Sequence, residues 1–86
     1  MPYYVYILLC EDGSYYTGHA KNVGYRFEQH KKGRGGRYTK IHRPVKIVYT
    51  EEFENRSEAV KREREIKSFN HSQKQRLTSL HYSSKV

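Results

Sequence analysis

The sequence is poor in residues that brace very small proteins with covalent or metal links. Cys10 is the one cysteine, so no disulfide can form within the chain. No group of Cys and His residues has zinc-ligand spacing. A chain of 86 residues supports one hydrophobic core. We therefore expect a single domain over residues 1–86 that folds without such links, with a tail that frays from about residue 81.

Long apolar runs are also missing. The run Tyr3–Cys10 is too short to cross a bilayer, and it has neither a basic leader nor a small-residue cleavage site. A cytoplasmic protein without a membrane partner is the expectation. The sequence has little negative charge to offset 17 Lys and Arg residues, and its net charge is +8.

A field of this sign attracts polyanions, and nucleic acid is the first candidate partner. An anionic membrane is a weaker candidate, because neither of the two longer predicted helices has a wide apolar face. A basic protein with no polyanionic partner is the plain alternative.

The hydrophobic patterns predict an α+β fold, in which helices flank a small three-stranded sheet in the order β-β-α-β-α-α. Asp12-Gly13 predicts a tight antiparallel first hairpin, because both residues tolerate positive φ. Asn22, Asn55 and Ser72 are the expected helix N-caps. The expected strands cover residues 3–9, 15–17 and 45–49, and the expected helices cover 23–32, 55–69 and 72–80.

The third predicted strand is short and apolar. Val45, Ile47 and Tyr49 alternate along it and are expected to face the core.

Two predicted helices carry polar groups on or beside their apolar faces. Glu63 lies midway between apolar residues three positions before and after it. Arg26 and His30 border the apolar face of the first helix in the same way. One interpretation pairs Glu63 with Arg26 or Lys67 at the core margin, or lets the long side chains reach water. The other interpretation is a functional site.

A basic segment, residues 31–46, contains seven cations and no acid. Its three glycines are expected to keep the first half flexible. The segment is not a nucleotide-binding loop, because no Gly-Lys-Ser/Thr follows the glycines. It is a candidate to bind a phosphate backbone and to stack an aromatic ring on a base, with a solvated loop as the alternative. The candidate nucleic-acid-binding residues are Lys32, Arg34, Arg37, Tyr38, Lys40 and Arg43.

The first two strands complete a more specific pattern. Tyr4-Val5-Tyr6 and, ten residues later, Tyr16-Thr17-Gly18 resemble the two half-motifs of the GIY-YIG nuclease family. Arg26 and Glu63 follow in that family's order. The chain is similar to small bacterial stand-alone members, which share a basic stretch like Arg37–Lys40 and a helix like Glu58–Lys67. The resemblance extends from Tyr3 to about Leu80.

Three positions depart from the family pattern. Tyr4 replaces the glycine of the first half-motif, and Thr17 replaces the isoleucine of the second. His19 stands where related incision nucleases often have lysine. This last change affects the expected rate more than the expected fold.

The resemblance implies a role for each site residue. Glu63 would be the single protein ligand of Mg²⁺, or of Mn²⁺, with waters and phosphate oxygens completing the shell. Arg26 would bind the scissile phosphate. Tyr6 and Tyr16 would position the attacking water and remove its proton, although a phenol with an ordinary pKa of about 10 needs a nearby cation to act as a base.

Two further residues have roles with open alternatives. His30 would orient a phosphate or relay a proton, and a helix-surface histidine is the alternative. Gly18 would allow a close approach between strand and helix, and a simple turn glycine is the alternative.

The leading hypothesis is therefore a metal-dependent endonuclease that hydrolyses a phosphodiester in DNA. A second hypothesis is a nucleic-acid-binding module with the same fold and little or no cleavage. A third is a subunit that cuts only with a protein partner. A monomer is the expectation, although the sequence does not define the oligomeric state.

Overall fold

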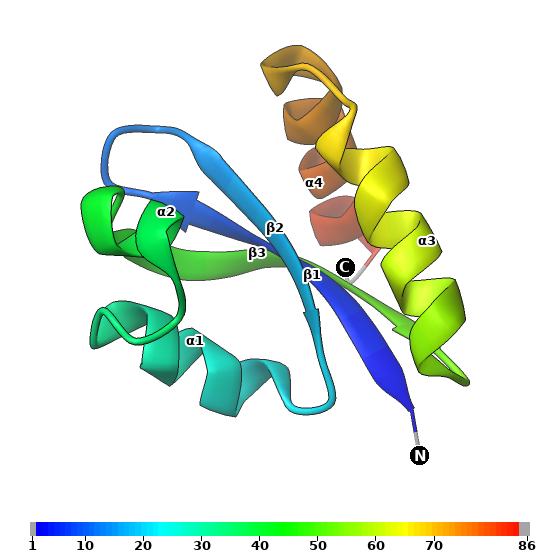
Figure 1. Cartoon of the computed structure of the whole chain (residues 1–86). Coiled ribbons are helices and arrows are strands. Elements are labelled where there is room, and N and C mark those ends of the chain that lie inside the picture. The colour runs from blue at the N-terminus through cyan, green and yellow to red at the C-terminus, as the bar shows by residue number, and fades with distance from the viewer. Residues whose placement is uncertain (1, 85–86) are drawn as a thin grey trace.

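The computed structural model describes residues 2–84 and has an α+β fold, which confirms the predicted class (Figure 1). The predicted elements are all present, and one short helix is added within the basic segment. In chain order the elements are β1 (Tyr3–Cys10), β2 (Tyr15–Ala20), α1 (Val23–Lys31), α2 (Arg37–Ile41), β3 (Pro44–Phe53), α3 (Arg56–Lys67) and α4 (His71–Ser84).

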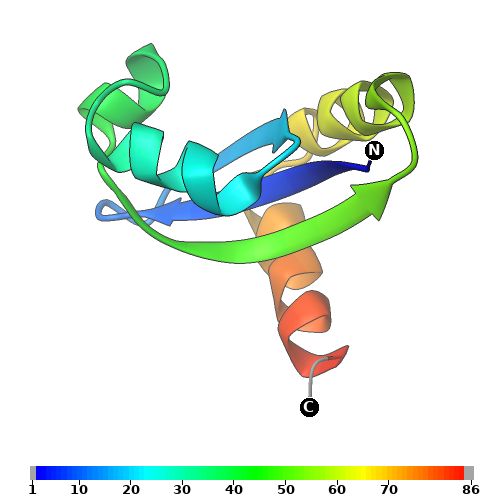
Figure 2. The same ribbon diagram turned by 90° about the horizontal axis from the view of Figure 1, so that it is seen from below.

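The sheet has the strand order β2-β1-β3, and both pairings are antiparallel. Figure 2 shows β1 between its two partners. Figure 1 shows α1 and α2 on one side of the sheet and α3 and α4 on the other. Each face of β1 is therefore covered, and its side chains can be apolar on both faces.

The main core lies between the sheet and α3. Val5 and Ile7 are fully buried there against Ala59, Ile66 and Tyr49. Each large apolar side chain buried in this way contributes roughly 1.5–3 kcal/mol. Residues of β1 between these positions point to the α1 side, as strand alternation requires.

The first hairpin closes with a three-residue loop. The Gly13 amide donates to the Cys10 carbonyl at 3.0 Å, and the Cys10 amide donates to the Ser14 carbonyl at 2.9 Å. Gly13 has a φ of +85°, and no other residue between 2 and 84 except two glycines has a positive φ. Asp12 does not adopt this conformation. Asp12 instead accepts the Ser14 amide at 3.0 Å, which stabilises the turn from its side chain.

Two of the three predicted helix caps are confirmed. Asn22 accepts the Tyr25 amide at 2.9 Å and begins α1. Asn55 accepts the Glu58 amide at 3.0 Å and begins α3. Both side chains satisfy an amide that has no partner inside its helix.

The third predicted cap, Ser72, is wrong. Asn70 accepts the Gln73 amide at 2.8 Å, and Gln73 accepts the Asn70 amide at 2.9 Å. This reciprocal capping box begins α4 before Ser72. The helix continues to Ser84 and does not end near Leu80. Of the tail expected to fray, residues 85 and 86 lie outside the described part of the chain.

Strand β3 is longer than predicted and irregular. Ile7 pairs with Tyr49 while Leu8 pairs with Ile47, and a second register shift follows between Leu9 and Cys10. Val45 is the extra residue at the second shift, and it is 51% exposed. Its predicted inward position is therefore wrong, because a bulge turns the extra residue out of the alternation. Tyr49 is buried and pairs with Ile7, whereas Ile47 is half-buried and pairs with Leu8, which points to the other side of the sheet. The prediction that Ile47 and Tyr49 share one inward face is therefore also wrong, because the first register shift lies between them.

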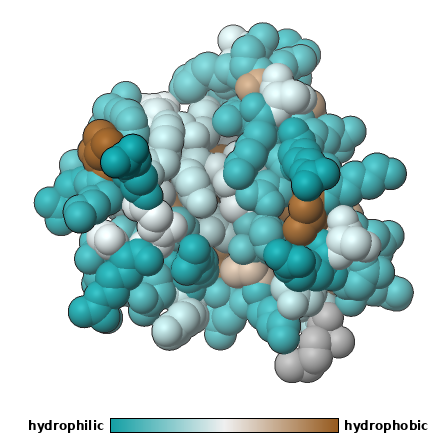
Figure 3. All heavy atoms as spheres, viewed as in Figure 1, coloured by the Kyte–Doolittle hydropathy of each residue, from teal (hydrophilic) through white to brown (hydrophobic). Residues whose placement is uncertain are grey.

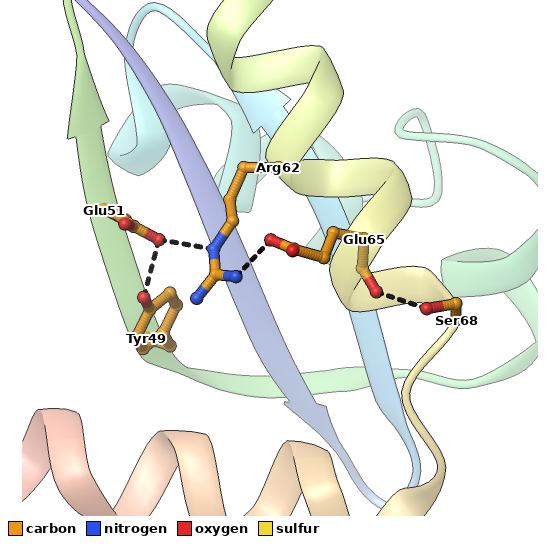
Figure 4. A network of polar contacts seen from close by, with 5 residues as sticks. All are labelled: Tyr49, Glu51, Arg62, Glu65 and Ser68. Carbon is orange, nitrogen blue, oxygen red and sulfur yellow. Dashed lines mark hydrogen bonds and ion pairs between the residues drawn. The ribbon is translucent and has the colours of Figure 1, made fainter.

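A polar network fixes α3 against β3 (Figure 4). Glu51 accepts hydrogen bonds from the Tyr49 hydroxyl at 2.7 Å and from Arg62 Nε at 2.9 Å. Arg62 also pairs with Glu65, and the Ser68 hydroxyl donates to the Glu65 carbonyl at 2.6 Å. The network sets the rotation of α3 about its axis, and thus which of its residues face the sheet.

The visible face of the molecule is mostly hydrophilic, with small and scattered apolar patches (Figure 3). Among the residues whose side chains the structure describes, the exposed large hydrophobic ones are Tyr25, Tyr38, Ile41 and Val45. Across residues 2–84, every helix is too short or too polar to traverse a lipid bilayer.

Candidate active site

The Tyr6 ring lies directly over Gly18. The two residues are paired across β1 and β2, and a Cβ atom added at Gly18 would lie 2.6 Å from the Tyr6 hydroxyl oxygen. Gly18 is inside a strand, so the turn interpretation does not hold. The close approach is between the strand and the Tyr6 ring, and not between a strand and a helix. Only glycine leaves room for the phenol in this position.

Beyond Tyr6, a buried line of hydrogen bonds continues into α1 and α2. The Tyr6 hydroxyl lies 2.8 Å from His30 Nε2, and His30 Nδ1 lies 2.7 Å from Thr39 Oγ1. All three side chains are at most 2% exposed. A Cβ atom at Gly35 would lie 2.0 Å from His30 Nδ1, so the backbone of Gly35 packs against the imidazole. His30 is therefore not a surface histidine.

Burial and neighbouring charges act on both ends of the Tyr6–His30 bond. Burial raises the pKa of Tyr6 well above its ordinary value, and Tyr16 adds to the rise, while Arg26 opposes it. Burial, and then the charge of Arg26, lower the pKa of His30 to about 4. At neutral pH the phenol is therefore protonated and the imidazole is neutral.

The proton arrangement follows from which groups can only donate. The positive charge of the Arg26 guanidinium acts on the Tyr6 oxygen, and the guanidinium has no acceptor of its own, so the phenol proton points away from it. The Tyr6 hydroxyl therefore donates to His30 Nε2. The neutral imidazole then carries its proton on Nδ1 and donates it to Thr39 Oγ1. Arg26 also reaches the Gly35 carbonyl at 3.4 Å, which holds the guanidinium near this line.

Aromatic rings pack around the line. The Tyr16 ring centroid lies 4.8 Å from that of His30 and 6.3 Å from that of Tyr6. Tyr38 lies 5.6 Å from Tyr16 and is stacked on His42 at 4.3 Å. One face of the Tyr38 ring is therefore already covered, and this limits the base stacking predicted for it.

Glu63 is held by two partners, His19 and Lys67. It is buried, its Oε1 lies 2.6 Å from His19 Nδ1, and its Oε2 lies 2.9 Å from Lys67 Nζ. Burial alone would raise the pKa of Glu63, but the hydrogen bonds and charges of Lys67 and His19 outweigh it and lower the pKa. Glu63 is thus ionised at neutral pH. Of the two predicted structural partners, Lys67 pairs with it and Arg26 does not.

The structure brings most of the predicted site together. Tyr6, Tyr16, Arg26 and His30 meet on the α1 side of the sheet. Glu63 lies on the α3 side, where it contacts His19, the residue that follows Gly18 in the edge strand β2. Its charge contributes to the raised pKa of Tyr6, but no direct contact joins the two side chains within residues 2–84.

The donor set fits a hydrated divalent ion better than a closed metal site. Residues 2–84 contain no group of three or more His, Cys, Asp or Glu side chains able to hold a metal. Mg²⁺ commonly uses one or two carboxylates together with waters and phosphate oxygens. Glu63 is ionised and suits this role once Lys67, whose side chain is 52% exposed, moves away from Oε2.

The basic segment is more ordered than predicted. It contains α2, and its glycines have structural roles that replace the expected flexibility: Gly33 and Gly36 have φ values of +77° and +129°, and Gly35 packs on His30. The predicted nucleic-acid-binding side chains are all exposed around α2, namely Lys32, Arg34, Arg37, Tyr38, Lys40 and Arg43.

Sequence reasoning missed two supporting residues and one contact. Thr39 and Gly35 hold the imidazole. Both lie in the basic segment, whose many charges are typical of a solvated loop. His19 was visible as a departure from the family motif, but its contact with Glu63 spans 44 residues and has no local signal.

Comparisons with known proteins give one consistent result. Residues 2–77 match the GIY-YIG catalytic domain. UPF0213 proteins of Staphylococcus aureus strains Mu3 and N315 are 53% identical over 75 residues, which is 87% of this chain and 92% of each relative.

Two solution NMR structures are similar in fold as well as sequence. The UPF0213 protein of Bacillus halodurans is 41% identical with a TM-score of 0.59, covering 93% of this chain and 85% of that one. A protein of E. faecalis is 39% identical with a TM-score of 0.62, covering 95% and 88%.

We predict that Gly18→Ala disrupts the site and that Gly24→Ala does not. The added methyl at position 18 collides with the Tyr6 hydroxyl, whereas at Gly24 its nearest neighbour is 3.6 Å away. Urea unfolding should show Gly18→Ala less stable by about 1–3 kcal/mol. Gly24→Ala, in an exposed helix position, should be neutral or more stable. Equal stability of the two variants would contradict the close approach at Gly18.

We predict that His30 makes stability depend on pH. Its folded pKa of about 4 lies below its ordinary value of about 6.5. The unfolded chain therefore binds more protons between these values, and the stability from a neutral His30 is lost as pH falls from 6.5 to 4. The loss is about 3 kcal/mol, measurable by urea unfolding at several pH values. The slope should be smaller in His30→Asn, and an unchanged slope there would assign it to other groups.

Proposed function

The chain belongs to the GIY-YIG catalytic domain family, a family of nucleases, and we propose that it is a metal-dependent endonuclease that hydrolyses a phosphodiester in DNA. One observation carries the proposal: a buried phenol is held by His30 over Gly18 with the Arg26 guanidinium beside it. Burial of polar groups is costly unless they are hydrogen-bonded, and buried groups whose pKa values are strongly shifted cluster at functional sites.

Arg26 is the phosphate-binding group in this proposal. The Gly35 carbonyl accepts a hydrogen bond from the Arg26 guanidinium. The positive charge of the guanidinium acts on the Tyr6 oxygen and opposes the rise in the Tyr6 pKa. A planar guanidinium can donate two hydrogen bonds to one phosphate and neutralise the charge added when water attacks.

The tyrosines orient the attacking water. The Tyr6 hydroxyl donates to His30 Nε2 and its ring packs over Gly18, so the position of its oxygen is fixed from both sides. Tyr16 is less buried and lies against the same imidazole. A proton leaving Tyr6 passes to His30 Nε2 along the existing 2.8 Å contact. Either tyrosine is placed to take the proton of the water.

Glu63 would hold the divalent ion, Mg²⁺ or Mn²⁺. When bound, the ion supplies positive charge to the phosphate and to water, which favours ionisation of neighbouring acidic groups. Glu63 contributes an ionised carboxylate at the edge of the tyrosine cluster, and His19 orients it through Oε1.

A second candidate function is nucleic-acid binding without cleavage. It is favoured by the two contacts that already occupy the Glu63 oxygens, and by the raised pKa of Tyr6, which makes the free phenol a weak base. In this case the exposed basic side chains around α2 would provide the affinity through phosphate contacts.

We predict that the protein nicks branched or single-stranded DNA in the presence of Mg²⁺ or Mn²⁺. Arg26→Ala and Glu63→Gln should each lower the rate by about 100-fold or more, because each removes a group that stabilises charge in the transition state. The readout is the cleavage of end-labelled DNA under single-turnover conditions.

Glu58→Gln is the matched control for Glu63→Gln. Glu58 is an exposed glutamate of the same helix, and its loss should leave the rate unchanged. Activity that survives both Arg26→Ala and Glu63→Gln, in folded variants, would remove the site assignment.

We predict that the double substitution Arg34→Gln/Arg37→Gln weakens DNA binding and lowers its salt dependence. Two lost phosphate contacts should reduce the slope of log K against log salt by about 1–2. Fluorescence anisotropy at several salt concentrations measures this. The control Lys61→Gln/Arg64→Gln removes the same charge from exposed positions of α3. A matching change in the control would mean that net charge, and not this surface, sets the affinity.

A further inference from the structure

We propose that a basic pocket beside α2 binds a terminal phosphate of a nucleic-acid strand. This inference rests on the proposed function only because it assumes that the phosphate belongs to a nucleic acid. The pocket has a volume of about 160 Å³ and lies between the end of α1, the following turn, α2 and the start of β3. Its lining residues are Lys31, Lys32, Gly33, Thr39, Lys40 and Arg43.

The charge of the pocket is of one sign. Four of its six lining residues are cations, and none is acidic. Lys31 has a neighbouring acid, Glu28, at 3.7 Å. The other three, Lys32, Lys40 and Arg43, form no ion pair within residues 2–84. Like charges gathered around a concave surface repel each other, and a bound anion relieves that repulsion.

Helix electrostatics explain only part of this cluster. Lys31 is the last residue of α1 and Lys32 is its C-cap, and cations are favourable at this end of a helix. Lys40 belongs to α2 and Arg43 precedes β3, so neither belongs to that helix end. The fold thus brings cations from separate elements to one concavity, and Gly33, with its φ of +77°, makes the turn that allows it.

Thr39 connects the pocket to the tyrosine cluster. It lines the pocket, and its hydroxyl oxygen accepts the Nδ1 proton of His30. The hydroxyl therefore keeps its own proton free to donate. A phosphate oxygen in the pocket is a suitable acceptor for that proton. The pocket and the proposed cleavage site then share one hydrogen-bond line through Thr39, His30 and Tyr6.

The number of cations favours a chain end over an internal phosphate. A terminal phosphate carries a charge of about −1.5 to −2 at neutral pH, whereas an internal phosphodiester carries −1. A terminal phosphate also presents three free oxygens and leaves the pocket in one direction, while an internal phosphate has a sugar on each side. The inferred substrate is thus a strand end held at a fixed distance from the cleavage site.

The test compares single-stranded DNA with a 5′-phosphate, a 3′-phosphate or no terminal phosphate, each labelled at the other end. Binding is measured by fluorescence anisotropy in EDTA, so that no cleavage occurs. One of the phosphorylated strands should bind about tenfold more tightly than the unphosphorylated strand, as expected for a charge-assisted hydrogen bond. Inorganic phosphate should shift the amide signals of Gly33, Thr39 and Lys40 in NMR spectra.

Lys40→Gln/Arg43→Gln should abolish the preference for the phosphorylated strand, because both residues line the pocket. Lys61→Gln/Arg64→Gln is the control: it removes the same charge from exposed positions of α3 and should retain the preference. Equal affinity for all three strands without phosphate-induced shifts would overturn the proposal, and so would a preference that survives in Lys40→Gln/Arg43→Gln. Phosphate-induced shifts with no binding of any strand would support the pocket while rejecting nucleic acid as its ligand. That outcome would overturn both this proposal and the proposed function, whereas equal affinity for all three strands would overturn this proposal alone.

Discussion

The hydrogen bond between the Tyr6 hydroxyl and His30 Nε2 is the interaction on which the rest of the site depends. It joins the central strand to α1 through two side chains that have almost no contact with water. Such a bond inside a protein is stronger than in water, and breaking it leaves two polar atoms buried without partners. The surroundings support it from each side: Gly18 makes room for the phenol, and Thr39 fixes the imidazole.

Local chemistry was enough to predict much of the fold. The first strand, the turn at Gly13 and the caps at Asn22 and Asn55 all depend on neighbouring residues, and the structure confirms them. The bulge at Val45 was not predictable, because it depends on how β3 pairs with a strand more than thirty residues earlier. The same limit applies to the site: its residues were identified by a family motif, while their contacts come from tertiary packing.

Electrostatics divide the site into two parts with different states. On the α1 side burial keeps the phenol and the imidazole neutral, and the charge of Arg26 favours the neutral imidazole while it opposes the rise in the pKa of Tyr6. On the α3 side Glu63 is kept ionised by His19 and Lys67. A neutral phenol and imidazole next to an ionised carboxylate suit a site in which proton transfer begins only after a phosphate and a cation have bound. The basic surface around α2 would bring the phosphate, which links the net charge of the chain to the chemistry proposed for its interior.

The protonation state of the His30 ring tests this account most directly. Long-range ¹H–¹⁵N NMR spectra of the imidazole at pH 7 distinguish its two nitrogens. We expect a neutral ring with the proton on Nδ1, donated to Thr39, and an unprotonated Nε2 that accepts from Tyr6. A proton on Nε2, or a ring that is charged at neutral pH, would contradict it.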